Sequence, residues 1–158
     1  MSWDNYKKAI TLMAEYEDEC DFVGERSEDV VKKAEQALGL RFSNMYRDFV
    51  KRYGAGNFGG EEIYGVIGED FENSSVPDAI WVTLTERKES NLPQNVLVIT
   101  DTGMGEWYCL DFNQCNAEGE PLVITYDSGL EPDEQKYDRI ANNFGDFLLA
   151  LVKEEVDY

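Results

Sequence analysis

The sequence contains no histidine and only 14 lysines and arginines, against 33 aspartates and glutamates. Histidine is the commonest general base and metal ligand near neutral pH, so its absence argues against the usual hydrolase and zinc chemistries. The formal net charge of −19 makes nucleic acids and anionic membranes poor partners, because their phosphate groups are repelled. The natural complement of such a chain is a basic protein.

Basic residues are scarcest in the middle of the chain. Residues 53–135 contain 17 acidic side chains and two basic ones, Arg87 and Lys88, which gives a net charge of −15. Residues 1–52 (11 acidic, nine basic) and residues 136–158 (five acidic, three basic) each carry −2. Many acidic chains are simply soluble. The concentration of charge in one stretch gives a binding surface comparable weight.

Cysteines and long apolar runs are also few. The three cysteines are odd in number and show no CxxC spacing, which predicts reduced thiols and a cytoplasmic location. Cys109 falls in an expected strand, so we expect a buried thiol and not a nucleophile. The first residues lack the pattern of a signal peptide, and the densest apolar run, 147–152, is too short to span a membrane. Length and an apolar content of 42% favour a single folded domain over residues 1–158.

Hydrophobic spacing and capping residues predict five helices. Tyr46, Phe49, Val50 and Tyr53 share one face of the third, which marks a core helix. The expected helices are 3–19, 28–38 after a Ser27 cap, 44–53 after a Ser43 cap, a short helix with Pro77 in its first turn and Trp81 on its apolar face, and 140–152.

Strand signals appear between and after these helices. The expected strands are 63–67, 95–100, 106–111 and 122–126, with a glycine-rich turn at 54–60 and a loop at 127–138. The last three strands are joined by a glycine turn and a polar loop, which indicates an antiparallel meander. The expected fold class is α+β: N-terminal helices, an antiparallel meander sheet with an inserted helix, and a C-terminal helix packed on the sheet.

The sequence offers weak candidates for chemistry. Asp101 and Glu106 flank one turn, where a structural role for Asp is the commoner use. The acidic stretch 127–134 does not have the ligand spacing of a calcium loop, and no nucleotide, zinc or serine-hydrolase motif occurs. Glu61 and Glu62 are adjacent on an expected strand and therefore point to opposite faces. No cofactor or metal is predicted.

Four segments carry a family resemblance. They are YRDFVKRYGAG (46–56), GEWYCLD (105–111), PLVITYD (121–127) and FGDFL (144–148). In this order they resemble the SUKH superfamily, the group that contains the yeast cell-wall-assembly regulator, over residues 25–153. The family's usual proline before the third helix is absent, and Phe42 and Ser43 stand there. The resemblance implies a fold, because the matching residues look like core and turn positions.

Many bacterial members of this superfamily are immunity proteins, so the resemblance implies a cytosolic protein that binds and neutralises a cognate toxin domain without catalysis. Nucleases are often basic, so an acidic protein that blocks one agrees with the charge. The alternatives are a regulatory or scaffold module with a non-toxin partner, and an acid- or metal-dependent hydrolase that uses Asp101, Glu106 or the loop after Asp127. The expected partner-binding residues are Glu61, Glu62, Glu69, Asp70, Glu72, Trp81, Asp101 and Glu106. The oligomeric state is not predicted.

Overall fold

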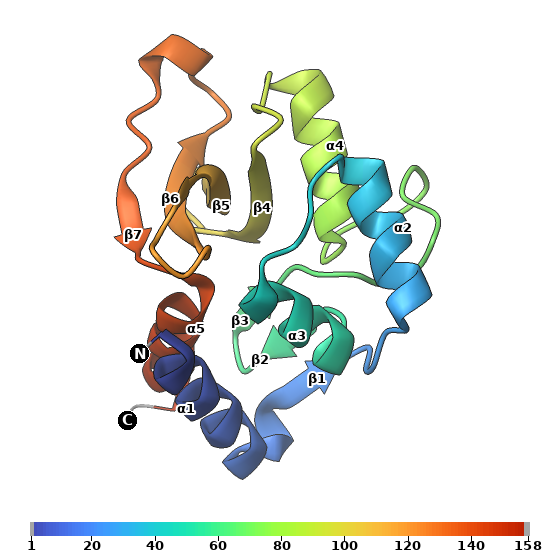
Figure 1. Cartoon of the computed structure of the whole chain (residues 1–158), viewed down its shortest axis with the longest axis vertical. Helices are drawn as coiled ribbons and strands as arrows, with labels where there is room; N and C mark the ends of the chain where they lie inside the picture. The colour runs from blue at the N-terminus through green and yellow to red at the C-terminus, as the bar shows by residue number, and fades with distance from the viewer. Residues whose placement is uncertain (1, 157–158) are drawn as a thin grey trace.

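The computed structural model describes residues 2–156 and has an α+β fold (Figure 1). The helices are α1 (Ser2–Glu15), α2 (Glu28–Leu38), α3 (Asn44–Tyr53), α4 (Ala79–Glu89) and α5 (Phe144–Glu155), with 3-10 turns η1 (Glu17–Glu19) and η2 (Pro132–Glu134). The strands are β1 (Cys20–Phe22), β2 (Gly56–Phe58), β3 (Glu61–Ile63), β4 (Val96–Asp101), β5 (Glu106–Cys115), β6 (Pro121–Asp127) and β7 (Arg139–Ala141).

The strands form two antiparallel sheets. β4, β5, β6 and β7 pair in chain order, which confirms the predicted meander, and β1, β2 and β3 form a small second sheet that the sequence did not indicate. In Figure 1 the larger sheet lies beside α4, whereas α1 and α5 lie side by side below it. α4 follows β3 and precedes β4, so it connects the two sheets.

Side-chain and glycine caps explain most helix ends. The Ser27 hydroxyl accepts a hydrogen bond from the Val30 N–H, and Gly39 ends α2 in the left-handed conformation, as predicted. Asp78 caps α4 by accepting from the N–H groups of Ile80 and Trp81. Pro77 therefore lies before the cap and not in the first turn of the helix, which corrects the prediction. Ser43 stands at the N-cap position of α3, but its side chain makes no capping hydrogen bond.

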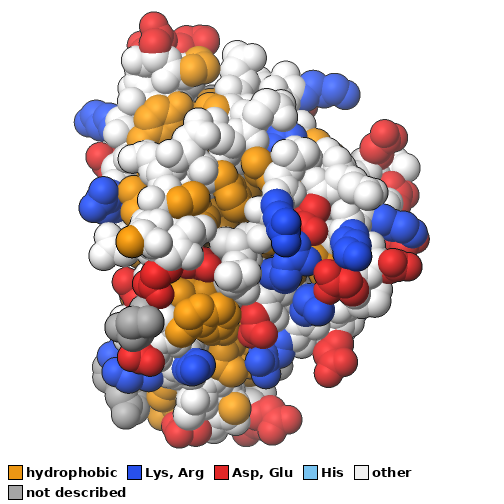
Figure 2. Space-filling view, in the orientation of Figure 1, with side chains coloured by type: hydrophobic (Ala, Val, Ile, Leu, Met, Phe, Trp, Pro, Cys, Tyr) orange, Lys and Arg blue, Asp and Glu red, His pale blue; other side chains and the backbone are white. Residues whose placement is uncertain are grey.

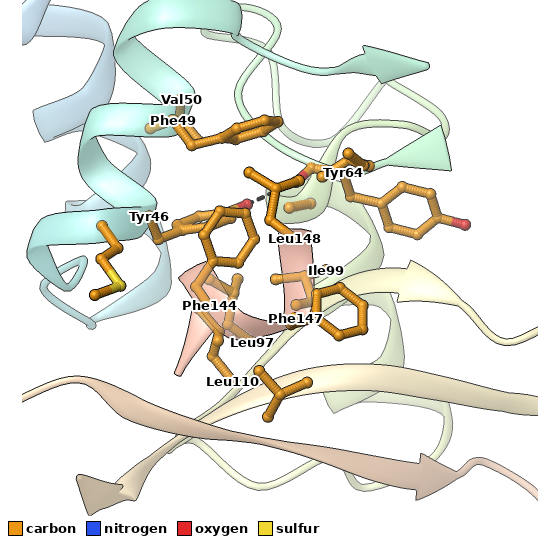
Figure 3. Close-up of a cluster of buried hydrophobic side chains, with 14 of the residues drawn as sticks. Tyr46, Phe49, Val50, Tyr64, Leu97, Ile99, Leu110, Phe144, Phe147 and Leu148 are labelled. Atoms are coloured by element: carbon orange, nitrogen blue, oxygen red, sulfur yellow. Dashed lines mark hydrogen bonds between the residues drawn. The ribbon is translucent and has the colours of Figure 1, made fainter. Parts of the chain in front are cut away.

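The core lies where α3 and α5 meet the inner face of the larger sheet (Figure 3). Phe49 is fully buried and contacts Phe144 with ring centroids 5.3 Å apart, and the Tyr46 hydroxyl donates to the Tyr64 carbonyl at 2.8 Å. Tyr46 and Val50 are buried as well, and Tyr53 is partly buried against the core, so the predicted stripe of this helix does face the core. Phe147 packs on Tyr108 of β5 at 5.1 Å, which attaches α5 to the sheet.

Several expected boundaries are wrong. The first helix ends at Glu15 and not at residue 19, and a 3-10 turn follows it. Residues 140–143 precede α5: Ile140 belongs to β7 and is 44% exposed, and Asn143 caps the helix by accepting from the Asp146 N–H. The glycine-rich turn contains β2, and the strand expected at 63–67 is instead β3 at residues 61–63. Short strands rich in glycine and glutamate lack the alternation on which strand prediction depends.

Close backbone contact explains the glycines around α3. A Cβ atom built on Gly65 would overlap the carbonyl oxygen of Gly54, and one built on Gly56 would overlap the Asp21 carbonyl oxygen. The chain leaving α3 therefore lies directly against the segment after β3 and against β1. Among residues 2–156, no helix is long and apolar enough to cross a membrane.

Candidate functional site

An acidic cluster forms where the β2–β3 hairpin meets the end of α5 and the start of β5. It consists of Glu61, Glu106, Glu154 and Glu155, and we call it the hairpin cluster. Glu61, Glu106 and Glu154 act electrostatically on Tyr108, and Glu155 acts on Glu61. Glu155 accepts a hydrogen bond from the backbone N–H of Gly60 at 2.6 Å, which holds the helix end against the hairpin. The preceding glycine, Gly59, donates to the backbone carbonyl of Glu19 at 2.8 Å, which joins the hairpin to η1.

The negative charges of the hairpin cluster are close enough to raise the pKa values of neighbouring groups. Partial burial raises the pKa of Glu61, and the carboxylates of Glu155 and Glu154 raise this pKa further. Burial also raises the pKa of Tyr108, with contributions from Glu61 and Glu154. In the described part of the chain, none of the four glutamates forms an ion pair with Lys or Arg. Such a surface is complementary to a cationic one.

Glu61 and Glu62 lie on opposite faces of β3 and have different neighbours, as predicted from strand alternation. Glu62 and Asp101 act on Tyr64, on the other side of β3 from Glu61: burial raises the pKa of Tyr64, and these two carboxylates add to the effect. The Asp101 carboxylate accepts from the Gly103 N–H at 2.7 Å, which is the structural turn role that the sequence favoured.

Glu69, Asp70 and Glu72 lie apart from the hairpin cluster, in the loop between β3 and α4 that passes beside α2 in Figure 1. Glu69 forms an ion pair with Lys33 of α2 at 2.6 Å. Asp70 accepts from the N–H groups of Glu72 and Asn73, which closes a local turn. The predicted binding residues therefore fall into separate groups, and two of the three loop acids have internal partners.

Trp81, on α4, is half-buried and packs against the hydrophobic core. Trp81 therefore lies on the apolar face of α4, where the sequence placed it, and only part of its side chain is open to a partner. In the hairpin cluster, the aromatic position is occupied by Tyr108, which was not predicted.

Ion pairs are concentrated over α2 and α3, where Figure 2 shows basic and acidic side chains interspersed. Arg47 bridges Glu28 and Glu35, Lys51 also pairs with Glu28, and Arg52 pairs with Asp48. Together with Lys33, four of the nine basic residues in residues 1–52 therefore have an acidic partner, in contrast to the glutamates of the hairpin cluster, which have no basic one among residues 2–156.

The described residues offer little for catalysis. No group of three or more Cys, Asp or Glu side chains in residues 2–156 has the geometry to hold a metal ion. In the acidic loop after β6, Asp127 accepts from the Gly129 N–H, and Glu131 and Glu134 form a capping box around η2. These carboxylates therefore have structural partners in the loop itself.

A hollow of about 720 Å³ lies between α1, the β5–β6 hairpin and the start of α5, and five of its 11 lining residues are Asn or Gln. Asn5 donates to the Asp146 carboxylate at 2.9 Å, and Asn143 is the α5 cap. The hydrogen bond between Asn5 and Asp146 therefore joins α1 to the start of α5.

The thiols are not activated. Cys109 is fully buried in β5, as predicted, and burial raises its pKa well above the ordinary thiol value. Burial likewise raises the pKa of Cys20 and Cys115, with smaller contributions from acidic neighbours. A nucleophilic cysteine requires the opposite shift.

Glu154 and Glu155 were missed by the sequence reasoning because they lie outside the acidic middle of the chain. The available signal was the pair of adjacent acids at the end of the closing helix, where negative charge opposes the helix dipole. Their meeting with Glu61 depends on where α5 ends against the hairpin, which a one-dimensional pattern does not reveal.

Comparison with protein families agrees with this architecture. The model of the SUKH_6 family, described as SMI1-KNR4 cell-wall, matches residues 28–148, which is well over half of the chain. The match runs from α2 to the middle of α5 and includes the core aromatics of α3, the hairpin and the meander. The fold, the core positions and this match establish that the chain belongs to the SUKH superfamily, within its SUKH_6 family.

Proposed function

We propose that this protein is a cytoplasmic immunity protein that binds a basic toxin domain through the hairpin cluster and neutralises it without catalysis. Membership of the SUKH superfamily is consistent with an immunity or binding module. The observation that carries the proposal is the gathering of Glu61, Glu106, Glu154 and Glu155 without a cationic partner in the described chain.

Unpaired like charges disfavour the folded state, because each carboxylate raises the cost of ionising its neighbour. A cationic protein surface offsets this repulsion when it binds. The same carboxylates that destabilise the free protein therefore make association more favourable. Complementary charge also accelerates encounter, and a nuclease that holds phosphate with Lys and Arg presents the required sign. Tyr108 adds an aromatic side chain at the centre of the same surface.

The experiment measures association of the purified protein with the product of a neighbouring toxin gene by surface plasmon resonance across a salt series. Charge reversal of Glu61, Glu154 and Glu155 to Lys is expected to lower the association rate by about tenfold or more at low salt. The matched control reverses three exposed acids elsewhere, Glu89, Asp133 and Asp138, and changes the net charge equally. We expect a much smaller effect from the control, and convergence of the two rates in 0.5 M salt.

Equal effects of the two triple variants would show that net charge, and not the hairpin cluster, governs association. A regulatory module with a harmless partner is the alternative, favoured by the cell-wall description of the matching family. Toxicity assays distinguish the two: co-expression rescues cells from an immunity protein's partner, whereas a regulator's partner is harmless when expressed alone.

A further inference from the structure

One edge of the small sheet, along β1, has no neighbouring strand. β1 pairs on one side only, with β2. Val23 donates to the Ala55 carbonyl, and Gly59 donates to the Glu19 carbonyl. In an antiparallel ladder these bonds direct the backbone groups of the odd-numbered residues of this segment toward β2. The N–H and C=O of Phe22 therefore point away from the sheet, and they have no hydrogen-bond partner among residues 2–156.

Apolar surface accompanies this edge. A hollow of about 550 Å³ lies between β1 and the C-terminal ends of α1 and α3. Phe22 and Tyr53 line it with ring centroids 5.0 Å apart, and both side chains are only partly buried. Tyr16 and Val23, which precede and follow β1 in the chain, are 38% and 45% exposed. Unpaired backbone groups and open aromatic surface therefore occur at the same place.

The charge around β1 indicates what this edge can accept. Residues 15–25 contain six acidic side chains and no basic one, whereas residues 136–141, which include the outer strand β7 of the larger sheet, contain two basic and one acidic. Charged side chains on an edge strand hinder pairing with a second copy, because like charges then meet across the new interface. The same charges favour a strand that carries Lys or Arg.

We propose that β1 binds an extended basic polypeptide segment, which adds a strand to the small sheet on the opposite side of β2 from Glu61. Cys20 and Phe22 line the hollow, and the exposed Asp21 side chain points to the other face. An added strand keeps this alternation, so the segment carries apolar side chains over the hollow and Lys or Arg beside Asp21. This inference goes beyond the proposed function, and it holds whichever protein carries the segment.

The experiment has to separate strand pairing from general attraction, because a protein of net charge −19 attracts any basic peptide. The probe is a labelled seven-residue peptide in which lysine alternates with valine. Two further versions are N-methylated, one on the valine amides and one on the lysine amides, and all three have the same charge. Only one of the two sets of amides can face β1 in an added strand.

Binding to the full-length protein is measured by fluorescence anisotropy in 0.15 M salt, and the site is located from amide chemical shifts. We expect saturable binding of the unmethylated peptide, with shifts centred on residues 16–23. One methylated version should bind about tenfold more weakly, because it loses its backbone hydrogen bonds to the edge, and the other should bind within about twofold of the parent peptide.

The protein variant is Asp21→Lys, and the matched control is Glu89→Lys, an exposed acid on α4 whose reversal changes the net charge equally. We expect the affinity to fall about fivefold or more in the first and much less in the second. The shift map and the methylated peptides use the unsubstituted protein, so they test the proposal even if a variant unfolds.

Four results would overturn the proposal. They are absence of saturable binding, equal affinities of the two methylated peptides, shifts centred on the hairpin cluster or on β7, and equal effects of the two protein variants. A dimer of the free protein that the peptide dissociates, seen by sedimentation, would overturn it as well, because the edge would then belong to a second copy.

Discussion

The carboxylate of Glu120, at the end of the β5–β6 hairpin, accepts a hydrogen bond from the backbone N–H of Met45 in the first turn of α3. The two residues are 75 positions apart in the chain, and Glu120 is 2% exposed. The unpaired N–H groups of a helix start favour a negative charge. A residue of the larger sheet thus satisfies part of the α3 N-terminus, while the side chain at the N-cap position, Ser43, does not.

This relationship predicts an unusual pH dependence. Burial raises the pKa of Glu120, although its hydrogen bonds around the α3 start oppose the shift. A carboxylate whose pKa is higher in the folded state stabilises the fold fully below its unfolded pKa, and this contribution is lost as the pH rises through the folded-state value. Glu120→Gln removes the ionisation but keeps an oxygen that can accept from Met45.

We therefore expect the free energy of unfolding of Glu120→Gln, relative to the parent, to increase as the pH is raised from 4 to 7. Urea titrations of both proteins at several pH values measure this difference, in which the titrations of all other groups largely cancel. A difference that is constant with pH, or that falls as the pH rises, would show that the ionised carboxylate is the form the fold prefers.

Ser43 is the N-cap residue of α3, and Asp78 is the N-cap residue of α4. Replacing each with alanine should change the stability of the protein by different amounts. Asp78 accepts two backbone hydrogen bonds, so Asp78→Ala is expected to lower the free energy of unfolding by about 1–2 kcal/mol. Ser43→Ala removes a buried hydroxyl that makes no capping bond, so we expect it to lower the free energy of unfolding by less than Asp78→Ala does. Thermal and urea unfolding of the two variants give the comparison, and equal costs would contradict it.

The core aromatics of α3 and α5 should be indispensable. Phe49 is fully buried among four aromatic rings, and Phe147 is 3% exposed. Phe49→Ala and Phe147→Ala are each expected to destabilise the fold by about 3–5 kcal/mol, because each leaves a cavity as well as losing burial. Calorimetry tests this directly, and a variant that melts like the parent would assign its aromatic residue to an exposed binding position.

The purified protein is expected to have no hydrolytic activity of its own. Asp101 is engaged in a turn, and Glu106 belongs to a cluster of like charges without a neighbouring nucleophile or base. Assays with ester, phosphodiester and peptide substrates, with and without added divalent metals, measure this. Reproducible turnover that disappears in Asp101→Ala or Glu106→Ala would refute the expectation and restore the hydrolase alternative.

The sequence predicted those elements whose apolar residues either recur with a helical period or form a continuous run. The stripe of α3 is an example of the first signal. Strands β4 and β6, which are buried over nearly their whole length, are examples of the second. Ile140 misled the prediction, since its spacing of four from Phe144 extends the helical pattern of α5 backwards. Asn143 held the correct signal: an N-cap residue ends such an extension.

The candidate site was predictable only in part. Glu61 and Glu106 were chosen from a stretch of high negative charge, and the structure brings both to Tyr108. Glu154 and Glu155 belong to the last helix of the chain, and tertiary packing places them near Glu61. Glu69 instead forms an ion pair with Lys33. Charge per segment gives the sign of a surface, whereas its composition depends on which segments the fold brings together.

The pairing of α1 with α5 bears on the order in which the protein is built. The two helices start side by side, where Tyr6 lies so close to Gly145 that a Cβ atom there would overlap it, yet more than 120 residues separate them. Contacts between such distant segments form late, because the loop that they close is long. During synthesis, the apolar face of α1 lacks its main partner until residues 144–155 have been made. The surface between these helices, which Lys7 and Lys153 line, therefore forms only after the C-terminal helix has been made.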